Sequence, residues 1–181
     1  LQKKNLITEE SLTEKMVIVK KNDTFSKIID HFFEDNNLKN IIISEINKEY
    51  NLKNLAIGQK IFFYKNRNNN QIVKINLPIN FTTDIVLKLE SNKVHLTKEK
   101  IKTRKEINSL EFTISSSLYE DGINAGVPLS ILTDAIRLYS FDIDFQRDIQ
   151  KNTKFEVSYQ VLFNAKRSSI TYGNIEYINL K

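Results

Sequence analysis

The chain of 181 residues contains no cysteine, only two histidines, four glycines and two prolines. The absence of cysteine excludes disulfides, thiolate nucleophiles and zinc–thiolate sites. So few glycines and prolines argue against a low-complexity or fibrous chain. No apolar run approaches the roughly 20 residues that a helix needs to span a bilayer. The chain begins at Leu1 without a signal-peptide pattern, so we expect a mature or trimmed protein from which any export signal or anchor has been removed.

An excess of basic residues gives the chain a formal net charge of +5 and a pI near 9.2. Positive charge favours anionic partners through long-range attraction, although a genome rich in lysine, asparagine and isoleucine codons would produce the same excess. The sequence shows no arginine–aromatic platform and no basic recognition helix. We therefore expect no nucleic-acid partner.

The stretch 16–65 predicts the order strand, helix, helix, strand. Its first segment, Met16–Lys20, is rich in the β-branched residues of strands. Large apolar residues then recur at helical spacing from Phe25 to Phe33, and again between about 40 and 50. A second strand, ending at Tyr64, would close a small βααβ domain.

From Gln71 onward, apolar residues alternate with polar ones, which predicts antiparallel strands with one wet face. The clearest alternation runs from Phe155 to Val161. Gly173-Asn174 predicts the turn of a terminal hairpin. The fold class expected for the whole chain is therefore α+β: the small βααβ domain, followed over 71–181 by a mostly antiparallel sheet with two covering helices.

Two polar stretches predict where the domains begin and end. Residues 1–15 contain few large apolar side chains, so we expect a flexible leader. Lys65–Asn70 is polar and without apolar periodicity, which is typical of a linker. The predicted domains are then 16–65 and 71–181.

The two helices of the second domain are predicted within Ser115–Ile149. Ser117 and Glu120 stand as Ser-x-x-Glu, a capping box that satisfies amides at a helix start. Pro128 fits the first turn of the following helix, where no amide donor is needed.

Metal chemistry in this chain depends on its two histidines, His31 and His95. His31 and Asp35 stand as His-x-x-x-Asp, but no His-x-His occurs, and catalytic zinc typically has three protein ligands. We therefore expect no catalytic residue and no metal-binding residue.

Three aspartates, Asp142, Asp144 and Asp148, approach the spacing of a calcium loop. An EF-hand also needs glycine at the sixth position and glutamate at the twelfth, where this chain has Arg147 and Thr153. Three interpretations stay open: ion pairs with Arg147, a surface that docks another domain, and a calcium site.

The segment SLY…AGVP…DIDF.RDI resembles the second domain of the LytM-type (lysostaphin-like) zinc metallopeptidases. The matching residues are Ser117, Leu118, Tyr119, Ala125, Gly126, Val127, Pro128, Asp142, Ile143, Asp144, Phe145, Arg147, Asp148 and Ile149. The resemblance implies a non-catalytic region before a peptidase domain, in a D,D-endopeptidase that cuts the peptide cross-links of peptidoglycan. Zinc would belong to that downstream domain, so we expect no cofactor in this chain. The residues expected to dock the peptidase domain are Tyr119, Asp142, Asp144, Phe145 and Arg147.

The edges of the first domain, VKKNDTFSKI and NLAIGQKIFF, resemble a LysM module, with Asn22 in place of the usual glycine and Phe25 in place of the usual leucine. LysM modules bind N-acetylglucosamine-containing glycans between the start of their first helix and the loop before their last strand. This resemblance implies the glycan-binding candidates Asp23, Thr24, Phe25, Ser26, Ala56, Ile57 and Gly58. The alternative is a LysM-like scaffold without a ligand, in which the same residues only cap a helix and form a turn.

Two hypotheses about function follow from these resemblances. The first is a regulatory or targeting region that docks on, or occludes, the active site of a peptidase in cis or in trans. The second is a module that tethers its protein to the glycan of peptidoglycan. Both imply a periplasmic or cell-envelope location, with membrane attachment only through a removed N-terminal anchor.

Overall fold

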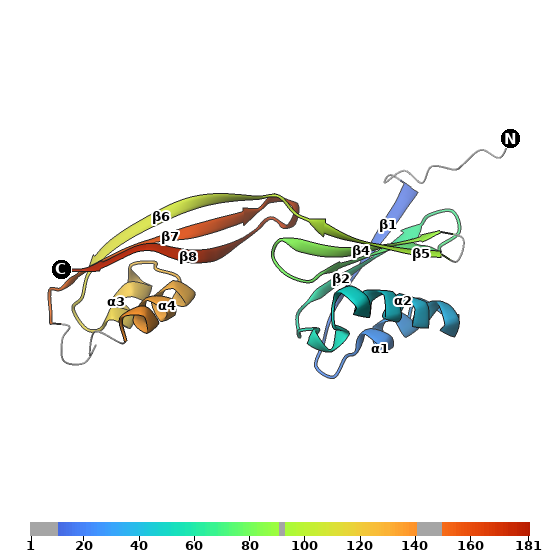
Figure 1. Cartoon of the computed structure of the whole chain (residues 1–181), viewed down its shortest axis with the longest axis horizontal. Helices are drawn as coiled ribbons and strands as arrows, with labels where there is room; N and C mark the ends of the chain where they lie inside the picture. The colour runs from blue at the N-terminus through green and yellow to red at the C-terminus, as the bar shows by residue number, and fades with distance from the viewer. Residues whose placement is uncertain (1–10, 91–92, 141–149) are drawn as a thin grey trace. The chain divides into compact units, whose positions relative to one another are not determined.

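The structure, a computed structural model, describes residues 11–90, 93–140 and 150–181. These residues form an α+β protein with two antiparallel sheets, one in each of two compact units (Figure 1). Unit 1 is Leu1–Ile101 and unit 2 is Lys102–Lys181. The predicted α+β class with antiparallel sheets is thus confirmed, whereas the LysM likeness of the first part stays a prediction. None of the described helices is long and apolar enough to span a bilayer.

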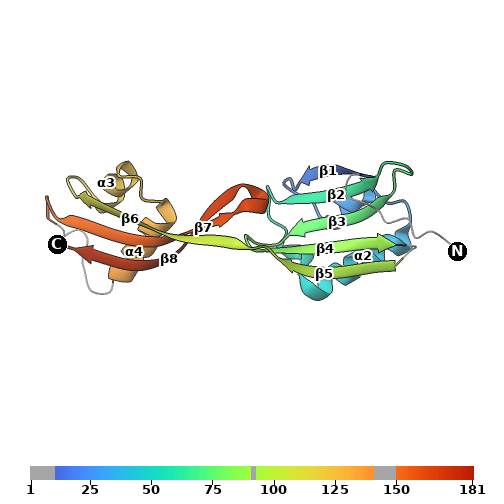
Figure 2. The same cartoon turned by 90° about the horizontal axis from the view of Figure 1, so that it is seen from above.

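Unit 1 is a five-stranded sheet with helices on one face (Figure 1). All neighbouring strands are antiparallel, and their order in the sheet is their order in the sequence (Figure 2). The strands are β1 (Leu12–Ile18), β2 (Lys60–Asn66), β3 (Ile72–Pro78), β4 (Thr83–Glu90) and β5 (Lys93–Lys100). The helices are α1 (Phe25–Asp30) and α2 (Asn36–Glu49), followed by a 3-10 turn, η2 (Leu52–Asn54).

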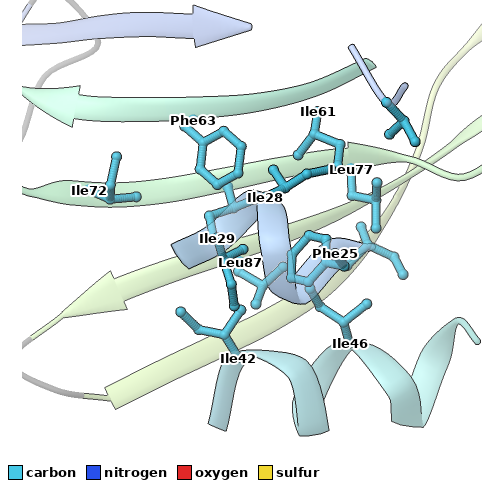
Figure 3. Close-up of a cluster of buried hydrophobic side chains, with 13 residues drawn as sticks. Phe25, Ile28, Ile29, Ile42, Ile46, Ile61, Phe63, Ile72, Leu77 and Leu87 are labelled. Atoms are coloured by element: carbon cyan, nitrogen blue, oxygen red, sulfur yellow. The ribbon is translucent and has the colours of Figure 1, made fainter. Parts of the chain in front are cut away.

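One apolar core lies between this sheet and the two helices (Figure 3). Successive side chains of a strand point to opposite faces, so every second residue of β2, β3 and β4 faces the helices. Phe63 of β2 is fully buried, and its ring stacks on that of Phe32 with centroids 3.9 Å apart. The other fully buried core residues are Ile29, Ile42, Ile46, Ile61, Ile75, Leu77, Ile85 and Leu87.

The predicted linker Lys65–Asn70 is instead the end of β2 and the turn of a hairpin. The Asn66 amide donates to the Gln71 carbonyl at 2.9 Å, and Asn70 takes a positive φ of 56° to reverse the chain. Phe63 before the turn and Ile75 after it belong to the same core. The boundary between domains predicted there was wrong, because a polar turn between two paired strands has the composition of a linker. Contacts divide the chain after Ile101.

The predicted leader 1–15 also reaches too far. Residues 1–10 lie outside the described residues. Leu12–Lys15, however, already pair with Asn66–Phe63 in the sheet. Backbone hydrogen bonding holds this segment although its side chains are mostly polar, as suits an edge strand.

The helices of unit 1 differ from their predicted limits. The pattern from Phe25 to Phe33 forms a helix only as far as Asp30, and Phe32 and Phe33 pack on the core from the following turn. The second helix begins at Asn36, earlier than expected, because the Asp35 carboxylate accepts from the Asn37 amide at 2.8 Å and caps it. Asn36 and Asn37 therefore begin a helix here, because the Asp35 cap satisfies the first amides.

Unit 2 is a three-stranded antiparallel sheet with two helices on one face (Figure 1). Its strands are β6 (Thr103–Thr113), β7 (Lys154–Asn164) and β8 (Ser169–Leu180), and its helices are α3 (Leu118–Asn124) and α4 (Leu129–Tyr139). Phe155, Val157 and Tyr159 of β7 face the helices and are buried, which confirms the predicted alternation.

The predicted hairpin turn at Gly173-Asn174 is not a turn. Both residues lie inside the single strand β8, where the register against β7 shifts between Tyr159 and Val161. A β-bulge accommodates extra residues without reversing the chain. The sequence signals of a bulge and of a tight turn overlap, since both use glycine and asparagine.

The last residue of the chain lies one residue beyond β8 and is hydrogen-bonded to the first residue of β7. The Lys154 amide donates to the Lys181 carbonyl at 2.8 Å, and the Lys181 amide donates to the Lys154 carbonyl at 2.9 Å. The Lys181 ammonium also lies 2.6 Å from a Glu156 carboxylate oxygen. Backbone and side chain therefore fix the same residue.

Adjacent isoleucines of α2 provide a test of this core. Ile42 is fully buried and Ile41 is 44% exposed. We expect Ile42→Ala to lower the free energy of unfolding of unit 1 by about 2–5 kcal/mol, because it removes buried methyl groups and leaves a cavity. Ile41→Ala should change it by less than about 1 kcal/mol. Urea unfolding followed by far-UV circular dichroism measures both, and equal losses would contradict the packing described.

Candidate functional site

The glycan-binding candidates lie in or directly after two loops of unit 1 that run side by side. These loops are residues 19–24, between β1 and α1, and residues 55–59, before β2, and together we call them the loop pair. The Val19 amide donates to the Gln59 carbonyl at 2.9 Å, and the Gly58 amide donates to the Val19 carbonyl at 2.8 Å. These two bonds extend the β1–β2 pairing beyond the last strand residues, so the sheet register itself sets the position of both loops.

The side chain of Gln59 fixes the second loop. Its Oε1 accepts from the Ala56 amide at 3.0 Å, and its Nε2 donates to the Pro78 carbonyl at 2.7 Å. One side chain thus closes the turn and anchors it to β3. Sequence reasoning used Gln59 only as part of a motif, although a glutamine directly after a turn glycine is able to bond the backbone in this way.

The first loop is held by its own polar side chains. The Asp23 Oδ2 accepts from the Lys20 amide at 2.8 Å, and the Thr24 Oγ1 accepts from the Lys27 amide at 3.2 Å as the N-cap of α1. Asn22 stands at the tip with φ 68°. Both capping groups therefore have a structural role that exists without any ligand.

The seven glycan-binding candidates differ in accessibility. Phe25 is only 3% exposed and belongs to the core, so its side chain is unavailable to a ligand. Ser26, Ala56 and Gly58 are exposed. Ile57 is 71% exposed.

Gly58 has a backbone reason to be glycine. Its φ is +87°, and a Cβ placed there would meet nothing within 4 Å. The residue is therefore required by the left-handed conformation of the turn and not by close packing.

The histidines do not form a metal centre with the acids near them in sequence. His31 is the C-cap of α1, and Asp35 is the N-cap of α2, where its carboxylate accepts an amide proton. His95 lies on β5. In the part of the chain that the structure describes, no group of three His, Cys, Asp or Glu side chains could hold a metal ion. The zinc of the resembling peptidases therefore does not fit the described residues.

Of the predicted docking residues, only Tyr119 can be placed. It lies on α3, is 50% exposed, and is followed one turn later by Ile123, which is 42% exposed. Asp142, Asp144, Phe145 and Arg147 lie outside the described residues. The calcium alternative at these aspartates lies there too.

The start of α3 is organised by a residue that the capping-box prediction missed. Ser117 caps the helix as expected, because its Oγ accepts from the Glu120 amide at 3.0 Å. In a capping box the Glu120 carboxylate would bond the amide of the N-cap residue. Here the Asp121 carboxylate does so: it accepts from the Ser115, Ser116 and Ser117 amides at 2.7, 2.8 and 3.2 Å. These backbone bonds, first those of Ser116 and Ser115, hold the pKa of Asp121 below its ordinary value.

Substitution at Gly58 tests whether it is only a turn residue. Gly58→Ala should lower the free energy of unfolding of unit 1 by about 1–2 kcal/mol, the cost of a left-handed conformation for an ordinary residue. Gly58→Asn should cost less, because asparagine visits that region more readily. Gly126→Ala, which has the same φ of +87° in unit 2, is the matched control and should cost as much there. If thermal melting shows that Gly58→Ala is as stable as wild type, the turn does not require a left-handed residue at this position.

The Asp121 carboxylate predicts an acid-dependent contribution to unit 2. A carboxyl group whose folded pKa is depressed stabilises the fold above its unfolded pKa of about 3.9, and the contribution is lost as the pH falls through the folded value. Asp121→Asn should therefore melt below wild type at pH 5–7, and the gap should close below about pH 3.9. Asp134→Asn is the control, since the half-exposed Asp134 carboxylate on α4 lies 3.4 Å from the Arg137 guanidinium and bonds no run of backbone amides in the described contacts. A gap that persists in acid would contradict a role for the charge.

Comparison with known proteins shows similarity in fold without a match in sequence. No family model matches the chain, and no curated protein sequence matches it. The structure of a zinc-containing peptidase from Vibrio cholerae superposes with a TM-score of 0.70 at 14% identity, over 92% of this chain and 51% of that one. Two crystal forms of Helicobacter pylori Csd3 give TM-scores of 0.64 and 0.65 at 16% and 15% identity, over 92% of this chain and 44% and 45% of theirs. The chain thus spans about half the length of the structures that it matches, and what it shares with them is the fold of that half.

Proposed function

We propose that this chain is the non-catalytic part of a peptidoglycan-hydrolase-like envelope protein of the LytM type. Its role is to dock on, or to occlude, the active site of a zinc peptidase domain. The observation that carries the proposal is the extent of the fold match: 92% of this chain covers 51% of a zinc-containing peptidase. The sequence motif that includes α3 and the start of α4 resembles the same family and supports the proposal independently.

The chemistry of the chain supports a non-catalytic role. Hydrolysis by a zinc peptidase needs a metal that polarises the carbonyl and activates water, with typically three protein ligands. The sequence has two histidines and no cysteine. The two histidines are at the end of α1 and on β5. Within the described ranges, neither histidine belongs to a group of three side chains that could hold a metal ion. We therefore propose that the zinc ligands of the peptidase reaction belong to a different domain.

The exposed side chains of α3 favour a docking role. Tyr119 and Ile123 lie four residues apart, which places them on one face of the helix. An aromatic side chain and a branched aliphatic one, each about half exposed, are apolar side chains available to a protein interface, and aromatic residues are enriched among interface anchors. We propose that this face contacts the peptidase domain.

A glycan-binding role is the second candidate. It is favoured by the hydrogen bonds of Val19, which bring the two predicted walls of the groove together. Five of the seven candidate side chains, however, are either buried, engaged in capping, or glycine or alanine. The groove would therefore bind mainly through backbone groups and the exposed side chains of Ser26 and Ile57.

The docking proposal is tested with a LytM-type peptidase domain and purified peptidoglycan. The chain alone should release no cross-linked peptides, with or without added Zn²⁺. Added in trans at micromolar concentration, it should slow hydrolysis by the peptidase domain severalfold. Tyr119→Ala should weaken this inhibition by about fivefold or more, because truncation of an aromatic anchor typically costs over 1 kcal/mol.

Leu138→Ala is the matched control, since Leu138 is 56% exposed on α4 of the same unit. It should leave inhibition unchanged within about twofold. Release of peptides by the chain alone would overturn the non-catalytic assignment. Sequencing of the gene beyond the codon of Lys181 gives an independent readout, since the proposal predicts His-x-x-x-Asp and His-x-His downstream. Co-sedimentation with sacculi tests the second candidate, and no retention at low salt would remove it.

A further inference from the structure

The net charge of the chain resides in unit 1. Residues 1–101 contain 17 Lys and Arg against 12 Asp and Glu, whereas residues 102–181 contain 10 of each. A lysine-rich composition alone would raise the charge of both units. The position of the basic residues within unit 1 is therefore informative.

Four of these lysines lie at the loop pair. Lys20 and Lys21 belong to the first loop, and Lys27 is in α1, where its ammonium donates to the Asn22 carbonyl at 3.2 Å. Lys60 is the first residue of β2 and lies opposite Ile18. All four are exposed, and we call them the lysine cluster.

The lysine cluster has little acidic compensation. The acidic residues closest to it in this part of the sequence are Asp23, whose carboxylate accepts the Lys20 amide, and Asp30, one turn after Lys27, whose carboxylate pairs with Lys39. Ion pairs of unit 1 occupy other lysines, Lys39, Lys48 and Lys98. Among the described contacts, none of the four ammonium groups lies against a carboxylate.

The backbone beneath the lysine cluster is fixed without a partner. The bonds of Val19 to Gly58 and Gln59, and those of Gln59 to Ala56 and Pro78, hold both loops. A preorganised cationic surface attracts anions without the cost of ordering its loops. Ile57, 71% exposed, adds an apolar contact beside the charges.

We propose that the lysine cluster binds a carboxylate-bearing polymer, which in the envelope is the peptide-substituted strand of the cell wall. The inference rests on the proposed envelope function and adds to it that the ligand is recognised by its negative charge. Lysine ammoniums are flexible point charges that suit scattered carboxylates, and the cluster contains no arginine for bidentate pairing. A membrane surface is the less favoured partner, because interfacial anchors are rich in Trp, Phe and Leu. In the loop pair Leu55 packs on the core, and Phe25, which follows the first loop, is buried.

The test compares binding to native sacculi with binding to sacculi whose carboxylates have been converted to methylamides. Binding to native sacculi in low salt should be at least tenfold stronger, and it should fall steeply between 50 and 300 mM NaCl. Soluble polygalacturonate should compete, and neutral dextran should not. Lys20→Gln combined with Lys21→Gln should weaken binding about fivefold to thirtyfold, since exposed charge pairs contribute up to about 1 kcal/mol each.

The matched control combines Lys88→Gln with Lys93→Gln, which removes the same charge from exposed positions on β4 and β5 of the same unit. It should reduce binding less than twofold. Equal losses in both double variants would overturn the cluster in favour of diffuse charge. Binding to phosphatidylglycerol vesicles but not to polygalacturonate would replace it with a membrane surface. Equal retention on methylamidated and native sacculi would overturn recognition by charge and would leave the proposed envelope function intact. If instead the peptidase inhibition test fails, binding to polygalacturonate still decides whether the lysine cluster recognises carboxylates.

Discussion

The helix-facing side of the five-stranded sheet has to be covered, and this requirement fixes most of unit 1. Fully burying one isoleucine or phenylalanine contributes about 1.5–3 kcal/mol, and β2, β3 and β4 each place such residues on that face. α1 and α2 are the elements that cover them. Each helix alone is too short to be stable in water. The helices and the apolar side of the sheet therefore form together, and the loops between them are positioned as a consequence.

Apolar periodicity predicted the parts of the fold that this burial determines. The alternation in β7 and the helical spacing after Phe25 both correspond to buried residues. Turns, bulges and linkers were predicted less well, because all three are rich in glycine and asparagine. Asparagines that looked like a linker at 65–70 make a hairpin turn, and Gly173-Asn174 makes a bulge. Long-range pairing distinguishes these cases, and a local pattern does not contain it.

The candidate site shows the same division. The sequence motifs indicated the two loops that the structure brings together, since capping and turn residues carry strong local signals. The bond that anchors the second loop to the sheet runs from Gln59 to Pro78, 19 residues away, and no local spacing predicts such a contact. In unit 2, the capping serine was predicted and the neighbouring Asp121 was not, because three successive amides converge on it only when the chain turns before α3.

The pairing of Lys154 with Lys181 has a mechanical consequence for whatever is joined to this region. A flexible tether lets its cargo sample a volume that grows with tether length, and its effective concentration at a target falls accordingly. Here the final residue is bonded on both its amide and its carbonyl, so a polypeptide attached to it departs from a fixed origin. Unit 2 would then hold the start of the attached part against the first residue of β7.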